Sequence, residues 1–168
     1  EFRRVLFRTI FIRKDGIIII SANIEETEKT IAGDLEIWKN LKQDLSTIFE
    51  GHKNLSNLLA QRTRYISEKK ITAAIAPKVK VDNASDPNFS IVRIEARDHL
   101  GMLYKISKVF SDLDIRIHSA KVSTQGGRGI DVFYVSHQNK KILFEKLVRR
   151  TKEKVISAMM VKNPEELG

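Results

Sequence analysis

The spacing of the apolar residues changes once between residues 78 and 113, and this change restricts the fold more than any other feature. Residues 78–82 and 91–97 alternate apolar and polar positions, which is the period of a strand with one buried face. After Gly101 the apolar residues recur at steps of three and four, as on one side of a helix: Leu103, Ile106, Val109, Phe110 and Leu113. The sequence therefore predicts strands whose apolar face is covered by a helix.

The rest of the second half continues this pattern. Residues 115–124 and 130–136 are typical of two strands joined by a glycine-rich turn, and residues 142–160 predict a closing amphipathic helix. The order strand, helix, strand, strand, helix is that of a split βαβ motif with helices on one face of an antiparallel sheet. We expect the α+β class and a ferredoxin-like βαββαβ topology.

The first half resembles the end of the second. Residues 9–24 predict a hairpin around an Asp-Gly turn, and apolar steps over residues 31–48 predict a helix that ends near Gly51. Asp15-Gly16-Ile17 aligns with Arg128-Gly129-Ile130, and a long helix follows each hairpin. We interpret the first half as a partial repeat that lacks its first strand and helix.

These patterns divide the chain into parts. We expect a partial repeat of a hairpin plus helices (9–62), a linker (63–77), a complete domain (78–161) and a frayed tail (162–168). Residues 1–8, EFRRVLFR, are similar to the in-frame translation of a common sequencing adapter, and we expect them to be non-native and the natural protein to be longer. Without their three arginines and one glutamate, the net charge falls from +9 to +7.

Composition excludes several kinds of site. With 42% hydrophobic and 30% charged residues, no run long enough to span a bilayer and no cysteine, we expect a soluble cytoplasmic protein without disulfides. No two of the four histidines have the helical i, i+4 spacing of a zinc site, so we predict no metal. The positive charge favours nucleic acid or an anionic surface as a partner only if further features support it.

Three blocks of the second half, in order, carry a family resemblance. They are IEARDHLGMLY at 94–104, DIRIHSAKV at 114–122 and GIDVFYV at 129–135, preceded by a Val-Asp-Asn strand at 81–83. Together they resemble the last ACT domain of the bacterial PII uridylyltransferase/uridylyl-removing enzymes, and residues 9–62 resemble the preceding ACT repeat more weakly. Where that family usually has arginine and proline before the glycine, this chain has His99 and Leu100.

The resemblance implies a regulatory part of a larger enzyme. In that family one catalytic domain uridylylates the PII protein, with Mg and UTP expected as cofactors, a second removes the uridylyl group, and the ACT pair senses glutamine. This chain has no Gly-Ser followed by paired aspartates and no adjacent His-Asp pair, so we expect no catalytic residue and no cofactor in it. The implied partners are glutamine, the rest of the parent enzyme, PII and an ACT-ACT dimer, with no nucleic acid and no membrane.

The resemblance also implies a ligand site. Backbone amides at the start of the helix that follows Gly101 suit a carboxylate, and Asp98 suits an ammonium group. By the resemblance, the ligand lies between this loop and the facing strand of a neighbouring ACT domain, and the expected ligand-binding residues are Asp98, Gly101, Met102, Leu103, Ile117, His118 and Ser119. The structural alternatives are that Asp98 only caps the helix, that Gly101 only relieves crowding and that His118 is an ordinary strand residue.

Two other functions fit the fold. An ACT domain that regulates an amino-acid biosynthetic enzyme has the same topology but lacks the three blocks. A ferredoxin-like RNA-binding module stacks bases on aromatic residues exposed on its central strands. Residues 90–97 contain no aromatic residue, and adjacent Phe133 and Tyr134 point to opposite faces of a strand, which disfavours RNA binding.

Overall fold

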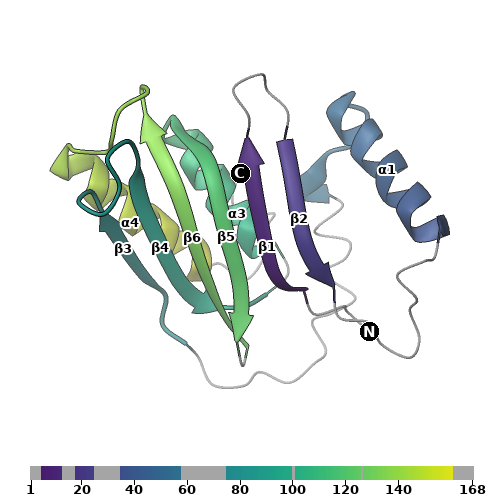
Figure 1. Ribbon diagram of the computed structural model, residues 1–168, viewed down its shortest axis with the longest axis horizontal. Coiled ribbons are helices and arrows are strands. Elements are labelled where there is room, and N and C mark those ends of the chain that lie inside the picture. Colours follow the sequence, from purple (N-terminus) through teal and green to yellow (C-terminus); the bar gives the residue numbers. More distant parts are fainter. Residues whose placement is uncertain are drawn as a thin grey trace.

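One antiparallel sheet organises the structure, a computed structural model that describes residues 5–12, 18–24, 35–57, 75–99, 101–125 and 127–160. Its six strands lie in the order β2-β1-β5-β6-β4-β3 (Figure 1). The strands are β1 (Val5–Ile12), β2 (Ile18–Ile24), β3 (Lys78–Asp82), β4 (Ser90–Arg97), β5 (Ile115–Gln125) and β6 (Arg128–His137). The helices are α1 (Leu35–Phe49), α3 (Met102–Asp112) and α4 (Glu145–Met160).

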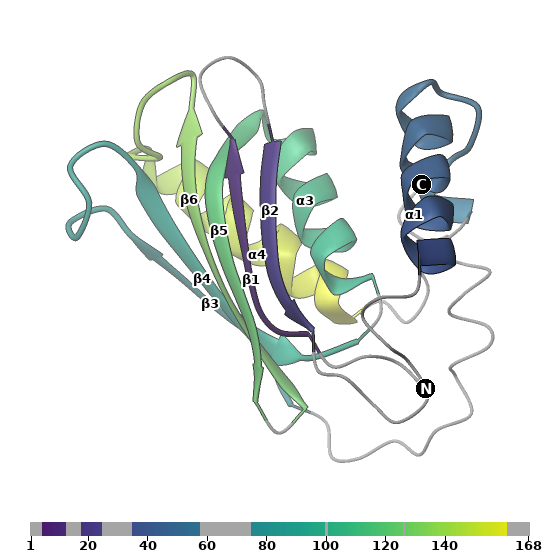
Figure 2. The ribbon, with the colours of Figure 1, turned by 45° about the vertical axis from the view of Figure 1, so that its right-hand side comes forward.

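The second half forms the predicted α+β unit. Helices α3 and α4 both lie on one face of the strands β5, β6, β4 and β3 (Figure 2). The α+β class and the ferredoxin-like arrangement are therefore confirmed. The strand beside β4 at the edge is β3, which precedes β4 in the chain and pairs with it from Lys78↔Glu95 to Asp82↔Ile91.

The alternation of β4 decides which face the helices cover. Its residues Val92, Ile94 and Ala96 are buried, while the residues between them are partly or fully exposed. Directly above this face, the rings of Phe110 and Phe133 pack edge to face with centroids 5.3 Å apart. Burying each such apolar side chain contributes about 1.5–3 kcal/mol, so this layer provides most of the stability of the unit.

The buried hydroxyl of Ser90 links the residue after β3 to the segment just before α4. Ser90 is fully buried, and its Oγ donates to Asn83 Oδ1 and accepts the backbone N–H of Ile142 at 2.7 Å. Asn83 Nδ2 donates in turn to the Ile142 carbonyl at 2.9 Å, and Lys141 Nζ donates to the Asn83 carbonyl at 2.9 Å. The residues just before α4 are thereby held against the end of β3.

The first hairpin extends the same sheet. β1 pairs antiparallel with β5 from Phe7↔Ser123 to Phe11↔Ser119, and with β2 on its other side. The order β2-β1-β5-β6 thus reads as two hairpins joined edge to edge through their first strands. β1 begins at Val5, so part of the segment predicted to be non-native lies in this strand; its origin stays a prediction.

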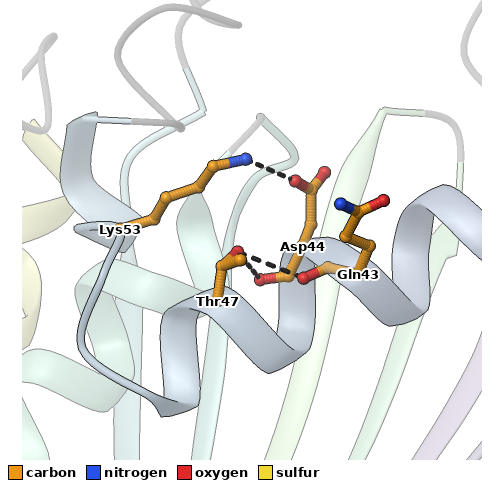
Figure 3. Close-up of polar contacts among 4 residues, drawn as sticks. All are labelled: Gln43, Asp44, Thr47 and Lys53. Carbon is orange, nitrogen blue, oxygen red and sulfur yellow. Dashed lines mark hydrogen bonds and ion pairs between the residues drawn. The ribbon is translucent and has the colours of Figure 1, made fainter.

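Helix α1 ends where the sequence predicts. Gly51 has φ 76°, its N–H donates to the Ile48 carbonyl at 3.0 Å, and the N–H of His52 donates to the Thr47 carbonyl at 2.9 Å. This is a Schellman motif, which satisfies the last carbonyls of the helix. Lys53 then folds back to Asp44, 2.9 Å from Nζ to Oδ1, while Thr47 Oγ1 donates to backbone carbonyls of the preceding turn (Figure 3).

The apolar stripe of α1 is only partly covered. Along it, Trp38, Leu41 and Leu45 are each more than 40% exposed, and Phe49 is 78% exposed. The Asp15-Gly16 turn, the predicted start of this helix at residue 31, most of the predicted linker and the tail at 162–168 lie outside the described residues. No helix in the described ranges combines the length and apolar character that crossing a membrane requires.

We predict that Phe110→Ala lowers the free energy of unfolding by about 3–5 kcal/mol, because it removes a fully buried ring and leaves a cavity beside Phe133. Phe144→Ala is the matched control: this ring is 76% exposed, so the expected loss is about 0.5 kcal/mol or less. Urea unfolding followed by circular dichroism measures both. Equal losses in the two variants would contradict the placement of the core.

Removing the Ser90 hydroxyl should also destabilise the fold. Ser90→Ala leaves the buried Ile142 N–H and Asn83 Oδ1 without this partner, at a cost of about 1–3 kcal/mol. Ser111→Ala on α3, where the side chain is exposed, should change stability by about 0.5 kcal/mol or less. A Ser90→Ala protein as stable as Ser111→Ala in urea unfolding would show that the bridge is unimportant.

Candidate functional site

The turn between β4 and α3 starts the helix without a side-chain cap. Gly101 is the N-cap residue, with φ 84° and ψ 0°, a left-handed conformation that glycine adopts without steric cost. Its carbonyl accepts the N–H of Lys105 at 3.0 Å, the first helical hydrogen bond. No side chain of the described residues makes a capping hydrogen bond at this end of α3, so the alternative that Asp98 serves only as a helix cap is wrong.

The amides of the first helical turn differ in their availability. The N–H of Met102 donates to the His99 carbonyl at 3.2 Å and is therefore occupied. No described residue accepts a hydrogen bond from the amides of Leu103 or Tyr104. Because the first N–H groups of any helix lack intrahelical acceptors and carry the positive end of its dipole, this position suits a small anion.

Asp98 precedes the glycine in the same turn and is held by hydrogen bonds to residues near the end of β5. Its backbone N–H donates to the Gly127 carbonyl at 2.9 Å, and its Oδ2 accepts the Thr124 hydroxyl at 2.7 Å. Both partners belong to the end of β5 and the turn after it. The Asp98 side chain remains exposed, so its carboxylate is oriented by Thr124 and still accessible to a cation.

His99 contributes a buried acceptor that the sequence reasoning did not include in the site. Its Nδ1 lies 3.0 Å from the Arg97 carbonyl, which places the proton on Nδ1, and its buried Nε2 has no hydrogen-bond partner among the described residues. Burial lowers the pKa of His99 below 6.5, and the hydrogen bond to Arg97 opposes that shift only in part. In the sequence, only the presence of His99 where the family usually has arginine indicated that this position could belong to the site.

Met102 and Leu103 belong mainly to the core. Met102 is 3% exposed, and a Cβ on Gly129 would come within 3.1 Å of its Sδ, so the sulfur packs directly over that glycine. Leu103 is half-buried against the same cluster. In a ligand site these two residues can therefore contribute their backbone more readily than their side chains.

The structure separates the predicted site residues into two groups. Ser119 pairs with Tyr134, whereas Thr124, the partner of Asp98, pairs with Gly129 near the other end of β5. At about 3.3 Å per residue along β5, the segment 117–119 lies roughly 16–23 Å from Thr124, which binds Asp98. The two groups therefore lie apart within this domain, and the expectation that one ligand contacts both of them at an interface between two ACT domains stays a prediction.

His118 occupies an irregular position in β5. The register of β5 against β6 shifts between Ile117 and Ser119, so His118 is the extra residue of a bulge. Its Nε2 lies 2.8 Å from Ser136 Oγ, and its ring lies against Phe89 with centroids 4.4 Å apart. Burial, followed by the nearby Arg116, lowers the pKa of His118.

The described surface offers neither a stacking platform on β4 and β6 nor a metal cluster. Phe133 is 1% exposed in the core, and only Tyr134 of the adjacent pair is half-buried on the other face. Within the described ranges, no group of three His, Asp or Glu side chains is arranged to hold a metal ion.

We predict that acid destabilises the fold partly through His99. Its folded-state pKa lies below the usual 6.5, so the unfolded chain binds more protons as the pH falls through 6.5, and the free energy of unfolding should decrease from pH 7 to pH 5. His99→Gln should reduce this slope. A His99→Gln protein with the parental slope in urea unfolding at several pH values would contradict a neutral, partly buried imidazole in the folded state.

Comparison with known proteins places the second half in a family. Residues 78–163 match the model of the family described as "ACR9-like, ACT-like domain". The chain is 29% identical over 108 residues to the bifunctional uridylyltransferase/uridylyl-removing enzyme of Azospirillum brasilense and 30% identical over 112 residues to that of Rhodospirillum rubrum. These alignments cover 64% and 67% of this chain but 12% of each relative. No solved structure shows significant similarity.

The matched region coincides with the unit that contains the turn at Gly101, from β3 through α4. It covers half of the chain, and the chain belongs to the ACR9-like, ACT-like domain family.

Proposed function

We propose that this chain is a regulatory module that binds free glutamine at the amino end of α3, within a cytoplasmic uridylyltransferase/uridylyl-removing enzyme that acts on PII. The observation that carries the proposal is the uncapped start of α3 at Gly101. The ACT-like family and the activity of the two related enzymes support the parent activity, for which Mg and UTP are the expected cofactors.

The two charged groups of an amino acid fit the two sides of this turn. A carboxylate would accept the amides of Leu103 and Tyr104, where the helix dipole favours negative charge. An ammonium group would donate to Asp98, whose carboxylate Thr124 already orients. Fixing an acceptor in this way lowers the entropy cost of binding, because less side-chain freedom is lost when the ligand arrives.

The position of the turn suggests how binding would be communicated. Thr124, which holds Asp98, directly follows Ser123, and Ser123 pairs with Phe7 where β5 meets β1. A ligand that fixes Asp98 and Thr124 would therefore favour one arrangement of the two joined hairpins. Such a ligand regulates only by the difference in its affinity for the two arrangements.

We predict that isothermal titration calorimetry detects glutamine binding to the full chain with a Kd between about 1 μM and 1 mM. Asp98→Asn should weaken binding about tenfold or more, because a hydrogen bond to a charged group contributes about 1.5–3 kcal/mol. Asp112→Asn, the same change at an exposed site at the far end of α3, should leave the Kd unchanged.

Asparagine and other amino acids serve as competing ligands in the same experiment. Preferential binding of another amino acid, sensitive to Asp98→Asn, would favour the alternative of an ACT domain that regulates a biosynthetic enzyme. Equal heats for glutamine, asparagine and buffer, or equal effects of the Asp98 and Asp112 substitutions, would contradict the proposed site.

A further inference from the structure

The face of the sheet opposite α3 and α4 carries a group of basic side chains. No described helix covers this face, which is turned toward the viewer in Figure 1. Residues that pair across strands lie on the same side of a sheet, so the pairings of β4 with β3 and β6 bring these side chains together. We call the five cations of this group the basic face: Lys78 and Lys80 of β3, Arg93 and Arg97 of β4, and Arg128 of β6.

Four members of the basic face place like charges directly opposite each other. Lys80 pairs with Arg93 across β3 and β4, and Arg97 pairs with Arg128 across β4 and β6. Directly opposed residues of an antiparallel pair have their Cβ atoms about 5 Å apart, and like charges in such a pair destabilise the sheet. A bound anion would relieve this repulsion.

Nearby carboxylates neutralise only a small part of this charge. Among the described residues, Glu95 is the one acidic side chain that forms ion pairs with the basic face: its carboxylate lies 2.9 Å from Arg93 Nε and 3.9 Å from Arg128 Nη1. Asp82 lies on the same side of β3, but its carboxylate accepts hydrogen bonds from the turn that follows it. The basic face therefore keeps an excess of positive charge.

The surroundings of the cations favour an acidic polypeptide over a small molecule or a nucleic acid. Small-molecule sites are concave, whereas these residues lie across the surface of a sheet. Single-stranded nucleic acids stack their bases on aromatic rings, but the residues of β6 that pair with Glu95 and Arg93 are the aliphatic Ile130 and Val132. Glu95, between the two like-charge pairs, would also repel a continuous row of phosphates.

The spacing of the two like-charge pairs restricts the sequence of the partner. Arg93 and Arg97 are four residues apart on β4, which corresponds to about 13 Å along the strand. An extended peptide spans the same length between its residues i and i+4. Its residue i+2 would then lie above Glu95.

We propose that the basic face binds an extended acidic segment of a protein partner, with carboxylates at positions i and i+4 and no carboxylate at i+2. One carboxylate would lie between Lys80 and Arg93 and the other between Arg97 and Arg128. Charge complementarity sets specificity and association rate more than affinity, and exposed ion pairs are screened by salt. The complex is therefore weak and depends on ionic strength.

The test uses the full chain and two synthetic peptides, acetylated and amidated, of the sequences GEETSEEG and GQQTSQQG. The first contains two pairs of glutamates four residues apart, and the second is its neutral counterpart. In a 15N NMR titration to millimolar peptide at about 0.1 M salt, where the Debye length is about 10 Å, the acidic peptide should shift the amides of β3, β4 and β6 most. The neutral peptide should cause no comparable shift.

Substitutions of equal charge locate the surface. The double variant Lys80→Gln, Arg93→Gln removes one like-charge pair and should weaken the acidic peptide at least fivefold. The double variant Arg149→Gln, Arg150→Gln removes the same charge from exposed positions on α4 and should change the Kd less than twofold.

Four results would overturn the proposal. They are the absence of shifts at millimolar acidic peptide, equal binding of the neutral peptide, and equal effects of the two double variants, which would mean that net charge alone attracts the peptide. The fourth is tighter binding of hexathymidylate than of the acidic peptide to the same strands, because a nucleic acid would then be the favoured occupant.

Discussion

The burial of one face of β4 beneath α3 and α4 is the constraint on which the rest of the structure depends. With Val92, Ile94 and Ala96 facing the helices, the chain must reverse direction within a few residues to bring Met102 and Phe110 over the sheet. A left-handed glycine at 101 makes that reversal, and Met102 packs onto Gly129 immediately afterwards. The helix therefore starts directly after this glycine, without a side-chain capping hydrogen bond from the described residues.

The pairing of β1 with β5 places this turn beside a junction between two similar hairpins. Asp98 is held by Thr124 at one end of the junction, while His118 and Ser119 lie toward its other end. The same pairing leaves the uncharged edge of β2 on the outside of the sheet. This strand pairing thus accounts for a position from which a ligand could influence both hairpins.

Local periodicity was enough to predict the α+β class, the strands β4, β5 and β6, the covering helices and the end of α1 at Gly51. It was enough because side chains at fixed spacing must share a face. The buried Nε2 of His99, the bulge at His118 and the distance of roughly 16–23 Å between the two groups of site residues could not be predicted in this way. They depend on register and on packing between segments distant in sequence, which no local pattern specifies.

The central claim is that a free amino acid binds the start of α3 through backbone amides. The most direct measurement is a 15N NMR titration of the full chain with glutamine, in which the amide of Leu103 or Tyr104 reports a bound carboxylate. The account predicts saturable shifts, largest at these two amides and at Asp98, and no comparable change at Asp112. Unchanged Leu103 and Tyr104 signals at glutamine concentrations well above 1 mM, with the rest of the spectrum that of a folded protein, would contradict it.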